Sequence, residues 1–455
     1  MNLDFLFRPK SIALAGAAHS DHKLGGIVLG NLLKFRGEVY PINPRYTELM
    51  GMKCYPTAFE IPAKVDLAVI MRPASEVPEM LCELKDKAKG AIIMSSGFSE
   101  IGEDLLQDEV RNLGKELGIR LIGPNCMGVY NPHHRLDTFF LPKERLPRPL
   151  KGNVSIVSQS GAILSCLLSV VKESHTGIAK AVGYGNAIDI DASDIFDYLA
   201  EDRQTGVVVS YIESVGDGRK FIASAKNLSD RKPFILLKSG KGPGGQAAAY
   251  SHTGRLAGRY DVFHSILRQF GIKEALDFDE LMDSAKALSM QPPLGGPLSA
   301  GVRQSEGVRR ICIITNGGGS GVLASDECMR QGLEVMHIPE EKKKKLASVF
   351  PDFYGLNNPV DLTAQVKDED YAVVMTELAE HYDGFILIAL PNVFGITANL
   401  GKVAGEARLK IKKPVTANIA SGGISAKITR LMEKSGIPVY PSPERAVRGL
   451  KALLY

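Results

Sequence analysis

The sequence has 455 residues, of which 44% are hydrophobic and 23% charged, which is ordinary for a globular protein with about three domains. Its formal net charge of +4 is small for this length, and no apolar run approaches the roughly 20 residues of a membrane span. The six cysteines are scattered without CxxC spacing, so we expect neither a metal site nor disulfides, and a cytoplasmic protein that binds neither nucleic acid nor membrane.

Residues 1–130 predict a Rossmann-like α/β domain, because short apolar runs alternate with glycine turns and amphipathic helices. A first strand at Ser11–Gly16 leads into a turn and a helix at Ile27–Phe35. Further strands are predicted at Glu38–Ile42, Val65–Met71, Gly90–Ser95 and Arg120–Ile122, with helices at Ser75–Lys87 and Glu103–Leu117. Residues 131–152 contain four prolines and are predicted to be a linker.

The same alternation predicts two more domains, at residues 153–290 and 310–455, joined by a linker at 291–309 that is rich in proline and glycine. The second domain begins with a strand at Asn153–Val157 and a helix at Ala162–Val171. Its later strands, Val207–Ile212 and Phe234–Lys238, precede a glycine-rich stretch. All three domains are expected to be doubly wound parallel sheets.

The first glycine turn, Gly16-Ala17-Ala18-His19-Ser20, lies between a strand and a helix, where free N–H groups bind anions. It lacks the GxGxxG spacing of a dinucleotide site, and the second strand ends at Asn43-Pro44 rather than at an acidic residue. Lys23 and Arg45 add positive charge nearby. The residues therefore disfavour NAD but leave a CoA-like ligand and other phosphate ligands equally open.

Two later turns are candidate phosphate cradles. Ser158-Gln159-Ser160-Gly161 fails the GxSxG pattern of a hydrolase, but Ser160 can cap a helix while Gly161 and Ala162 offer backbone N–H groups. A plain capped helix fits this turn equally well. Gly317-Gly318-Gly319-Ser320 offers a similar cradle without the Gly-Lys-Ser/Thr of a P-loop.

His252 lies in Tyr250-Ser251-His252-Thr253-Gly254, at the end of the glycine-rich stretch and beyond a strand end where α/β ligands bind. Glu213 directly follows the strand Val207–Ile212. Its carboxylate could accept Nδ1–H of His252 and leave Nε2 as a nucleophile. The alternatives are that His252 is simply exposed to solvent and that Glu213 forms a surface salt bridge.

Taken together, these motifs resemble a known family. Ser251-His252-Thr253-Gly254 resembles the phosphohistidine segment of ADP-forming acetyl-CoA synthetases, which are relatives of succinyl-CoA synthetase. The resemblance covers essentially the whole chain and continues through Tyr40–Pro44, Ser95–Phe98, Gly123–Gly128, Ile156–Gly161, Tyr211–Glu213 and Thr315–Gly319. It implies a CoA-binding Rossmann-like domain followed by two flavodoxin-like ligase domains.

The resemblance also implies site residues. The catalytic residues would be His252 and Glu213, with phosphate bound by Ser160, Gly161, Ala162, Gly318, Gly319 and Ser320. The residues expected to bind coenzyme A are Gly16, Ala17, Ala18, Ser20, Lys23, Leu24, Asn43, Pro44, Arg45, Ser95, Ser96, Gly97, Asn125 and Cys126. Arg255 departs from the small residue that related chains often have after the glycine.

The implied activity is conversion of acyl-CoA, ADP and phosphate into a carboxylate, CoA and ATP, with acetyl-CoA as the acyl donor. It would proceed through an acyl phosphate and a phosphohistidine on a swinging loop. The chain shows no ATP-grasp domain, so ADP/ATP and Mg²⁺ are expected on a separate β subunit in an α2β2 assembly. The alternative is a non-catalytic, CoA-sensing regulatory protein of the same fold.

Overall fold

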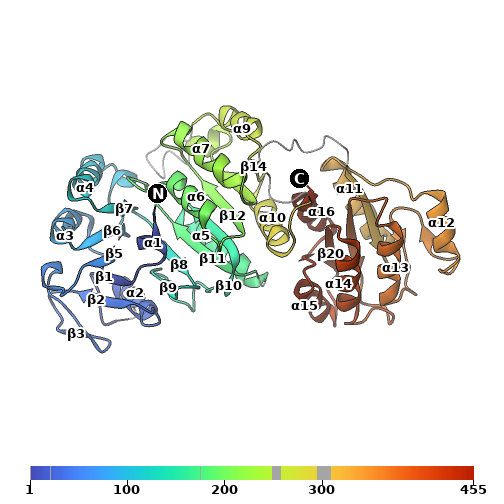
Figure 1. Ribbon diagram of the computed structural model, residues 1–455, viewed down its shortest axis with the longest axis horizontal. Helices are drawn as coiled ribbons and strands as arrows, with labels where there is room; N and C mark the ends of the chain where they lie inside the picture. Colours follow the sequence, from blue (N-terminus) through green and yellow to red (C-terminus); the bar gives the residue numbers. More distant parts are fainter. Residues whose placement is uncertain (1, 21, 175, 248–257, 295–308, 455) are drawn as a thin grey trace. The chain divides into compact units, whose positions relative to one another are not determined.

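The computed structural model describes residues 2–20, 22–174, 176–247, 258–294 and 309–454. The chain forms two compact units, residues 1–275 and residues 276–455. Both are built from largely parallel sheets and helices (Figure 1). The expected α/β class is confirmed.

The first sheet of unit 1 is parallel and has the strand order β2-β1-β5-β6-β7. Its strands are β1 Ser11–Ala15, β2 Glu38–Ile42, β5 Val65–Ile70, β6 Ala88–Ile93 and β7 Arg120–Ile122, and a short hairpin of β3 Glu48–Leu49 and β4 Met52–Lys53 follows β2. Its helices are α2 Leu24–Leu32, α3 Val77–Glu83 and α4 Asp104–Leu117, with 3-10 turns at Ala58–Glu60, Ala74–Glu76 and Ser99–Ile101. The central strands read as continuous apolar runs because helices cover both faces of a parallel sheet.

Helix α2 begins at Leu24, three residues before the predicted start at Ile27, and so includes Gly25 and Gly26. A Cβ atom on Gly25 would lie 2.0 Å from the Gly16 carbonyl oxygen, and one on Gly26 would lie 1.9 Å from that of Ser20. Gly16 itself has a φ of +86°, a conformation that favours glycine. These glycines therefore bring the start of the helix against the backbone of the first turn.

The second sheet of unit 1 has the order β14-β13-β12-β10-β11-β8-β9. Its parallel strands are β10 Lys151–Ser158, β11 Ile178–Gly183, β12 Val207–Ile212, β13 Phe234–Lys238 and β14 Lys273–Glu274, and its antiparallel edge is β8 Gly128–Asn131 and β9 Leu136–Asp137. The accompanying helices are α5 Gly161–Glu173, α6 Ala192–Glu201, α7 Gly218–Ser229 and α9 Tyr260–Gln269.

Residues 131–152 do not form the predicted linker. They include β9 and the start of β10, and Leu136 and Phe139 are fully buried. The buried carboxylate of Asp137 pairs with Arg148, with Nε 2.9 Å from Oδ2. Pro132 lies within a turn and Pro142 directly precedes one, and the apolar residues between them are packed into the protein.

Helix α1, Asp4–Phe7, connects the two sheets of unit 1. Leu6 and Phe7 are fully buried in a hydrophobic cluster that includes Leu14 of β1 and Val157 of β10. The Asn131 side chain donates a hydrogen bond to the Phe7 carbonyl at 2.8 Å, and the Tyr198 hydroxyl donates one to Asp4 at 2.9 Å. The two sheets that the sequence assigned to separate domains therefore share one core.

The sheet of unit 2 has the order β17-β18-β15-β19-β20-β21, with β16 also paired to β15. The strands are β15 Arg309–Thr315, β16 Leu333–Glu334, β17 Gly355–Leu356, β18 Val360–Asp361, β19 Gly384–Ala389, β20 Val415–Ile419 and β21 Val439–Tyr440. The helices are α10 Phe278–Met290, α11 Gly318–Arg330, α12 Glu340–Ala347, α13 Asp368–Leu378, α14 Leu400–Ile411, α15 Ser425–Lys434 and α16 Pro443–Leu454.

Helix α10 belongs to unit 2, although the sequence placed it at the end of the second domain, 153–290. Arg445 of α16 donates two charge-assisted hydrogen bonds to Asp283, from Nε at 2.9 Å and from Nη2 at 2.7 Å. The Tyr440 hydroxyl donates to the Asp283 carbonyl at 2.7 Å. These contacts hold α10 against α16 and the end of β21. Within the described ranges, none of the helices combines the length and the apolar character that crossing a membrane requires.

Candidate functional site

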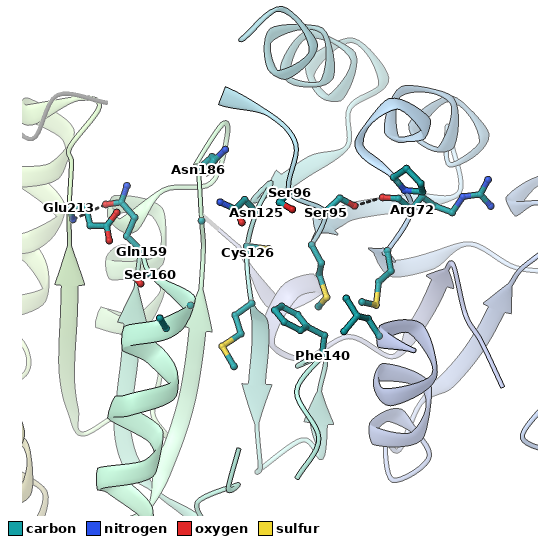
Figure 2. Close-up of a pocket in the computed structure, with 18 residues that line it drawn as sticks. Arg72, Ser95, Ser96, Asn125, Cys126, Phe140, Gln159, Ser160, Asn186 and Glu213 are labelled. Atoms are coloured by element: carbon teal, nitrogen blue, oxygen red, sulfur yellow. Dashed lines mark hydrogen bonds between the residues drawn. The ribbon is translucent and has the colours of Figure 1, made fainter. Parts of the chain in front are cut away.

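A cavity of about 680 Å³ lies in unit 1 where strands of both sheets reach their carboxyl ends (Figure 2). Each wall follows a parallel strand, which is the usual position of a ligand site in α/β sheets. The lining residues are Leu24, Met71, Arg72, Pro73, Met94, Ser95, Ser96, Asn125, Cys126, Met127, Phe140, Gln159, Ser160, Gly161, Ala162, Gly185, Asn186 and Glu213. The cavity thus brings together five of the predicted CoA residues, three predicted phosphate residues and Glu213.

The side of the cavity that holds the predicted CoA residues is formed by loops after β5, β6 and β7. The Ser95 hydroxyl donates to the Arg72 carbonyl, and the Asn125 N–H donates to the Ser95 carbonyl at 2.8 Å. The Cys126 thiol donates to the Ile93 carbonyl at 3.2 Å. Burial raises the pKa of Cys126 to about 12, so this thiol stays protonated and is a packing residue rather than a nucleophile.

Asn186 connects this side of the cavity to the second sheet and was not predicted. Its amide donates to Glu100 Oε2 at 2.7 Å and to Gln107 Oε1 at 2.9 Å. Glu100 Oε1 in turn accepts the N–H groups of Gly97 and Phe98 at 2.5 and 3.2 Å. Glu100 therefore fixes the loop that contains Ser95, Ser96 and Gly97 to the second sheet. Gly185 directly precedes Asn186 and has a φ of +58°, and a Cβ atom on it would lie 2.3 Å from the Pro124 carbonyl oxygen, so only glycine fits there.

Glu100→Gln is expected to lower the free energy of unfolding at pH 7, with less effect in acid. Burial alone would raise the pKa of Glu100, but the Asn186 amide and the N–H groups of Gly97 and Phe98 bind its charged form and lower the pKa overall. A lowered folded-state pKa stabilises the protein above the unfolded-state pKa near 4.5, and this stabilisation is lost as the pH falls through the folded-state value.

Urea denaturation of the Glu100→Gln variant and wild type at neutral pH and near pH 4 measures this difference. The matched control is Glu103→Gln, because the Glu103 side chain is exposed. An equal gap between variant and wild type at both pH values would contradict the assigned role of the Glu100 charge.

The side of the cavity that holds the predicted phosphate residues is the amino end of α5. Ser160 is the N-cap residue, with extended backbone angles (φ −96°, ψ 128°), and its hydroxyl oxygen accepts the Ile163 N–H at 3.4 Å. The Ser158 hydroxyl donates to the Ser160 carbonyl at 2.7 Å and so fixes the turn. Gly161 and Ala162 form the first turn of the helix, where N–H groups and the helix dipole favour an anion.

Ser160→Ala is expected to have a modest effect. Loss of the cap should cost about 1 kcal/mol of unfolding free energy. Loss of one weak anion contact should lower kcat roughly two- to fivefold. Chemical denaturation and initial rates, measured with the β subunit that the resemblance implies, test both effects. A fall in kcat of a hundredfold or more, with folding intact, would show instead that Ser160 acts on the reacting atoms.

Glu213 directly follows β12 and is 9% exposed. Its N–H donates to Gln159 Oε1 at 2.9 Å, and its carbonyl accepts the Lys238 Nζ at 2.7 Å. Burial lowers the pKa of Lys238 to about 8, although the nearby Glu213 charge opposes this shift. Burial raises the pKa of Tyr211; Ser239 opposes this shift and Glu213 adds to it. Glu213 is therefore held in a buried polar cluster at the cavity wall.

The other predicted CoA residues lie outside the cavity lining, Gly97 in the loop after β6 and the rest around the first glycine turn. Ala17 and Ala18 are buried, and the Asn43 side chain donates to the Ala17 carbonyl at 2.7 Å. Asn43 thus fixes the turn from the end of β2. Three of the remaining residues, Lys23, Pro44 and Arg45, are exposed beside this turn, and Gly16 and Ser20 within it are partly exposed.

The second predicted phosphate cradle lies in unit 2, where Gly317 is the N-cap of α11. The Gly317 N–H donates to the Thr315 hydroxyl oxygen at 3.0 Å, and Gly318 and Gly319 are exposed at the start of the helix, followed by Ser320. His252, with Ser251, Thr253, Gly254 and Arg255, lies outside the described residues. The expected contact between His252 and Glu213 therefore stays a prediction. Within the described ranges, no group of three or more His, Cys, Asp or Glu side chains is arranged to hold a metal ion.

Comparison with known proteins matches three domain families in order: a CoA binding domain at residues 10–132, a succinyl-CoA ligase-like flavodoxin domain at 151–288 and a ligase-CoA domain at 311–453. Together with the cavity, this order defines a CoA ligase of the succinyl-CoA ligase type. The chain belongs to the family of ADP-forming acetate–CoA ligases.

Three similar proteins support this assignment. The alpha subunit of ADP-forming acetate–CoA ligase II from Pyrococcus furiosus is 36% identical, with 99% of this chain and 97% of the relative covered. The ADP-forming acetate–CoA ligase of Methanocaldococcus jannaschii is 37% identical over 99% of this chain, which spans 63% of that longer relative. A solved acetyl-coenzyme A synthetase of Candidatus Korarchaeum cryptofilum, in complex with phosphate and ADP, has a TM-score of 0.89 at 34% identity and covers 99% of this chain and 96% of its own.

Proposed function

We propose that this chain is the α subunit of an ADP-forming acyl-CoA synthetase that interconverts acyl-CoA, ADP and phosphate with a carboxylate, CoA and ATP. Acetyl-CoA is the proposed acyl donor, because the similar proteins described above are named for acetate or acetyl-coenzyme A. The chain would act with a β subunit, as the relatives named subunit alpha suggest.

The observation that supports this proposal most directly is the shared cavity. It joins loops of the matched CoA-binding domain, at Ser95, Ser96 and Asn125, to the amino end of α5 and to Glu213. A thioester bound along the first wall would present its carbonyl carbon to an anion bound at the second. Apolar Met71, Met94, Met127 and Phe140 line the same space and suit the uncharged arm of CoA.

In the proposed reaction, phosphate held by Ser160, Gly161 and Ala162 attacks the thioester carbonyl. The C–S bond breaks, an acyl phosphate forms, and CoA leaves as a thiolate that takes up a proton. The phosphoryl group then passes to Nε2 of His252 and releases the carboxylate. Glu213 accepts Nδ1–H, which fixes the neutral tautomer and stabilises the charge that develops on the imidazole. Gly318, Gly319 and Ser320 would form a second phosphate cradle.

His252 would then deliver the phosphoryl group to ADP on the β subunit, an ATP-grasp chain that binds the nucleotide with Mg²⁺. Two copies of each subunit would make an α2β2 assembly. The CoA site would extend beyond the cavity to the remaining predicted residues, Gly16, Ala17, Ala18, Ser20, Lys23, Asn43, Pro44, Arg45 and Gly97. Lys23 and Arg45 are exposed, and their positive charges suit the phosphates of the CoA nucleotide.

The test is an acyl-CoA panel assayed with the co-purified partner subunit, with acetyl-CoA beside branched, aromatic and dicarboxylic thioesters. ATP formation that depends on acyl-CoA, phosphate and ADP together, with the highest kcat/KM for acetyl-CoA, is the expected result. A higher kcat/KM for another thioester would correct the acyl group alone. Failure of the whole panel with a folded complex would overturn the proposed reaction.

A further inference from the structure

Gln159 forms an unusual set of contacts beside the proposed catalytic carboxylate. Its Oε1 accepts two consecutive backbone N–H groups, from Glu213 at 2.9 Å and from Ser214 at 3.0 Å. Its Nε2 donates to the Ser214 hydroxyl oxygen at 3.0 Å. The side chain is buried, and Figure 2 shows it directly beside Glu213.

These contacts fix the orientation of the amide. A flipped amide would direct its NH₂ group at two N–H donors and leave both without an acceptor, which is costly for buried groups. A glutamate could accept the same two hydrogen bonds, but it would lose the donor to Ser214 and place a second negative charge beside Glu213. Glutamine meets the acceptor and donor requirements without adding charge.

Lys238 holds Glu213 from the opposite side. Strand β12 ends at Ile212, so Glu213 lies beyond the paired residues of the sheet. Its N–H is held by Gln159 from the end of β10, and its C=O by Lys238 from the end of β13. Two side chains therefore replace the backbone pairing that ends one residue earlier.

We propose that Gln159 is a positioning residue that fixes the Glu213 carboxylate relative to the phosphate cradle. Gln159 directly precedes Ser160, the cap of α5, so one residue joins the cradle to the backbone of Glu213. A change in its side chain would move the carboxylate while leaving the cradle in place. This inference rests on the proposed function, because it assigns Gln159 an effect only through Glu213.

The test is a double-mutant cycle in the complete complex with the β subunit. Gln159→Met has a similar length and removes both the acceptor and the donor. We expect it to lower kcat roughly tenfold to hundredfold, because small displacements of a catalytic group have effects of this size, while KM for acyl-CoA changes little. In the Glu213→Gln background the same change should lower kcat less than about threefold, since the effect passes through Glu213.

The matched control is Gln291→Met in unit 2. Gln291 is also buried and forms a similar pair of contacts, accepting the Val415 N–H at 3.1 Å and donating to the Val415 carbonyl at 2.5 Å, but it does not line the cavity. We expect it to lower the thermal stability comparably and to leave kcat unchanged. This comparison separates loss of a buried amide from loss of positioning.

The outcomes distinguish the positioning role of Gln159 from the proposed catalytic role of Glu213. If Gln159→Met lowers kcat by the same factor in the wild-type and Glu213→Gln backgrounds, or leaves kcat unchanged, the positioning role is wrong. If Glu213→Gln alone retains full activity, the proposed role of Glu213 fails first. A loss of kcat in Gln291→Met equal to that in Gln159→Met would show that general destabilisation explains the effect, which would also overturn the inference.

Discussion

Replacing His252 with alanine is expected to abolish turnover. The proposed reaction passes the phosphoryl group through Nε2 of His252, and alanine offers no atom that can form this covalent intermediate. Initial rates of ATP formation from acyl-CoA, phosphate and ADP, measured with the partner subunit, test this expectation. Incubation with labelled ATP should place an acid-labile, base-stable label on the wild-type chain and none on the variant.

The control for this variant is His337→Ala, because His337 is exposed in unit 2. It should keep full turnover and labelling. CoA binding to His252→Ala should also be preserved, since the cavity residues are unchanged. Substantial turnover of His252→Ala would refute the phosphohistidine. A wild-type complex that binds CoA but neither takes up label nor turns over would favour the non-catalytic, CoA-sensing alternative.

Glu213→Gln has the second-largest expected effect, a fall in kcat of about a hundredfold or more, with KM for acyl-CoA changed only a few-fold. The substitution keeps the shape of the side chain but removes the charge that would orient His252 and stabilise its developing positive charge; loss of a histidine-orienting carboxylate costs this much or more in other enzymes. Single-turnover measurement of phosphohistidine formation should show the same loss.

The control for the carboxylate is Glu201→Gln, at the exposed end of α6. Glu201 is 70% exposed and pairs with Arg231 at the surface, where an ion pair contributes little. The Glu201→Gln substitution should therefore leave kcat unchanged. Activity of Glu213→Gln close to that of wild type would exclude Glu213 as the partner of the histidine and favour the alternative of a salt bridge at a strand end.

Much of the fold could be predicted because strand, glycine turn and helix follow one another so regularly. Ser95, Asn125, Ser160 and Glu213 each lie just beyond a parallel strand, and the carboxyl ends of such strands meet at one edge. The position of each residue at the carboxyl edge of its own sheet therefore follows from the sequence. The common cavity does not, because two of these residues follow strands of one sheet and two follow strands of the other. The polar connections between the sheets do not follow from it either, because Asn186 and Glu100 are 86 residues apart in the sequence.

Two features of the fold were missed for identifiable reasons. The prolines of residues 131–152 suggested a linker, but buried Leu136 and Phe139 make this segment part of the second sheet. Gln159 lies inside the motif Ser158–Gly161, but only its neighbours Ser160 and Gly161 have the residue types that bind phosphate, so the prediction named them and not Gln159. An amide that binds backbone N–H groups has no sequence signature of its own, so only the contact with Glu213 reveals it.

Helix α1 limits how this protein can be divided or modified. Because Leu6 and Phe7 lie in the core that both sheets of unit 1 share, and the Asn131 side chain donates a hydrogen bond to the Phe7 carbonyl, helix α1 is part of that core. A gene fragment that begins at the matched CoA-binding domain, residue 10, would remove this helix and expose the core. Affinity tags therefore belong upstream of the helix, and the two halves of unit 1 are best cloned, exchanged or evolved as one piece.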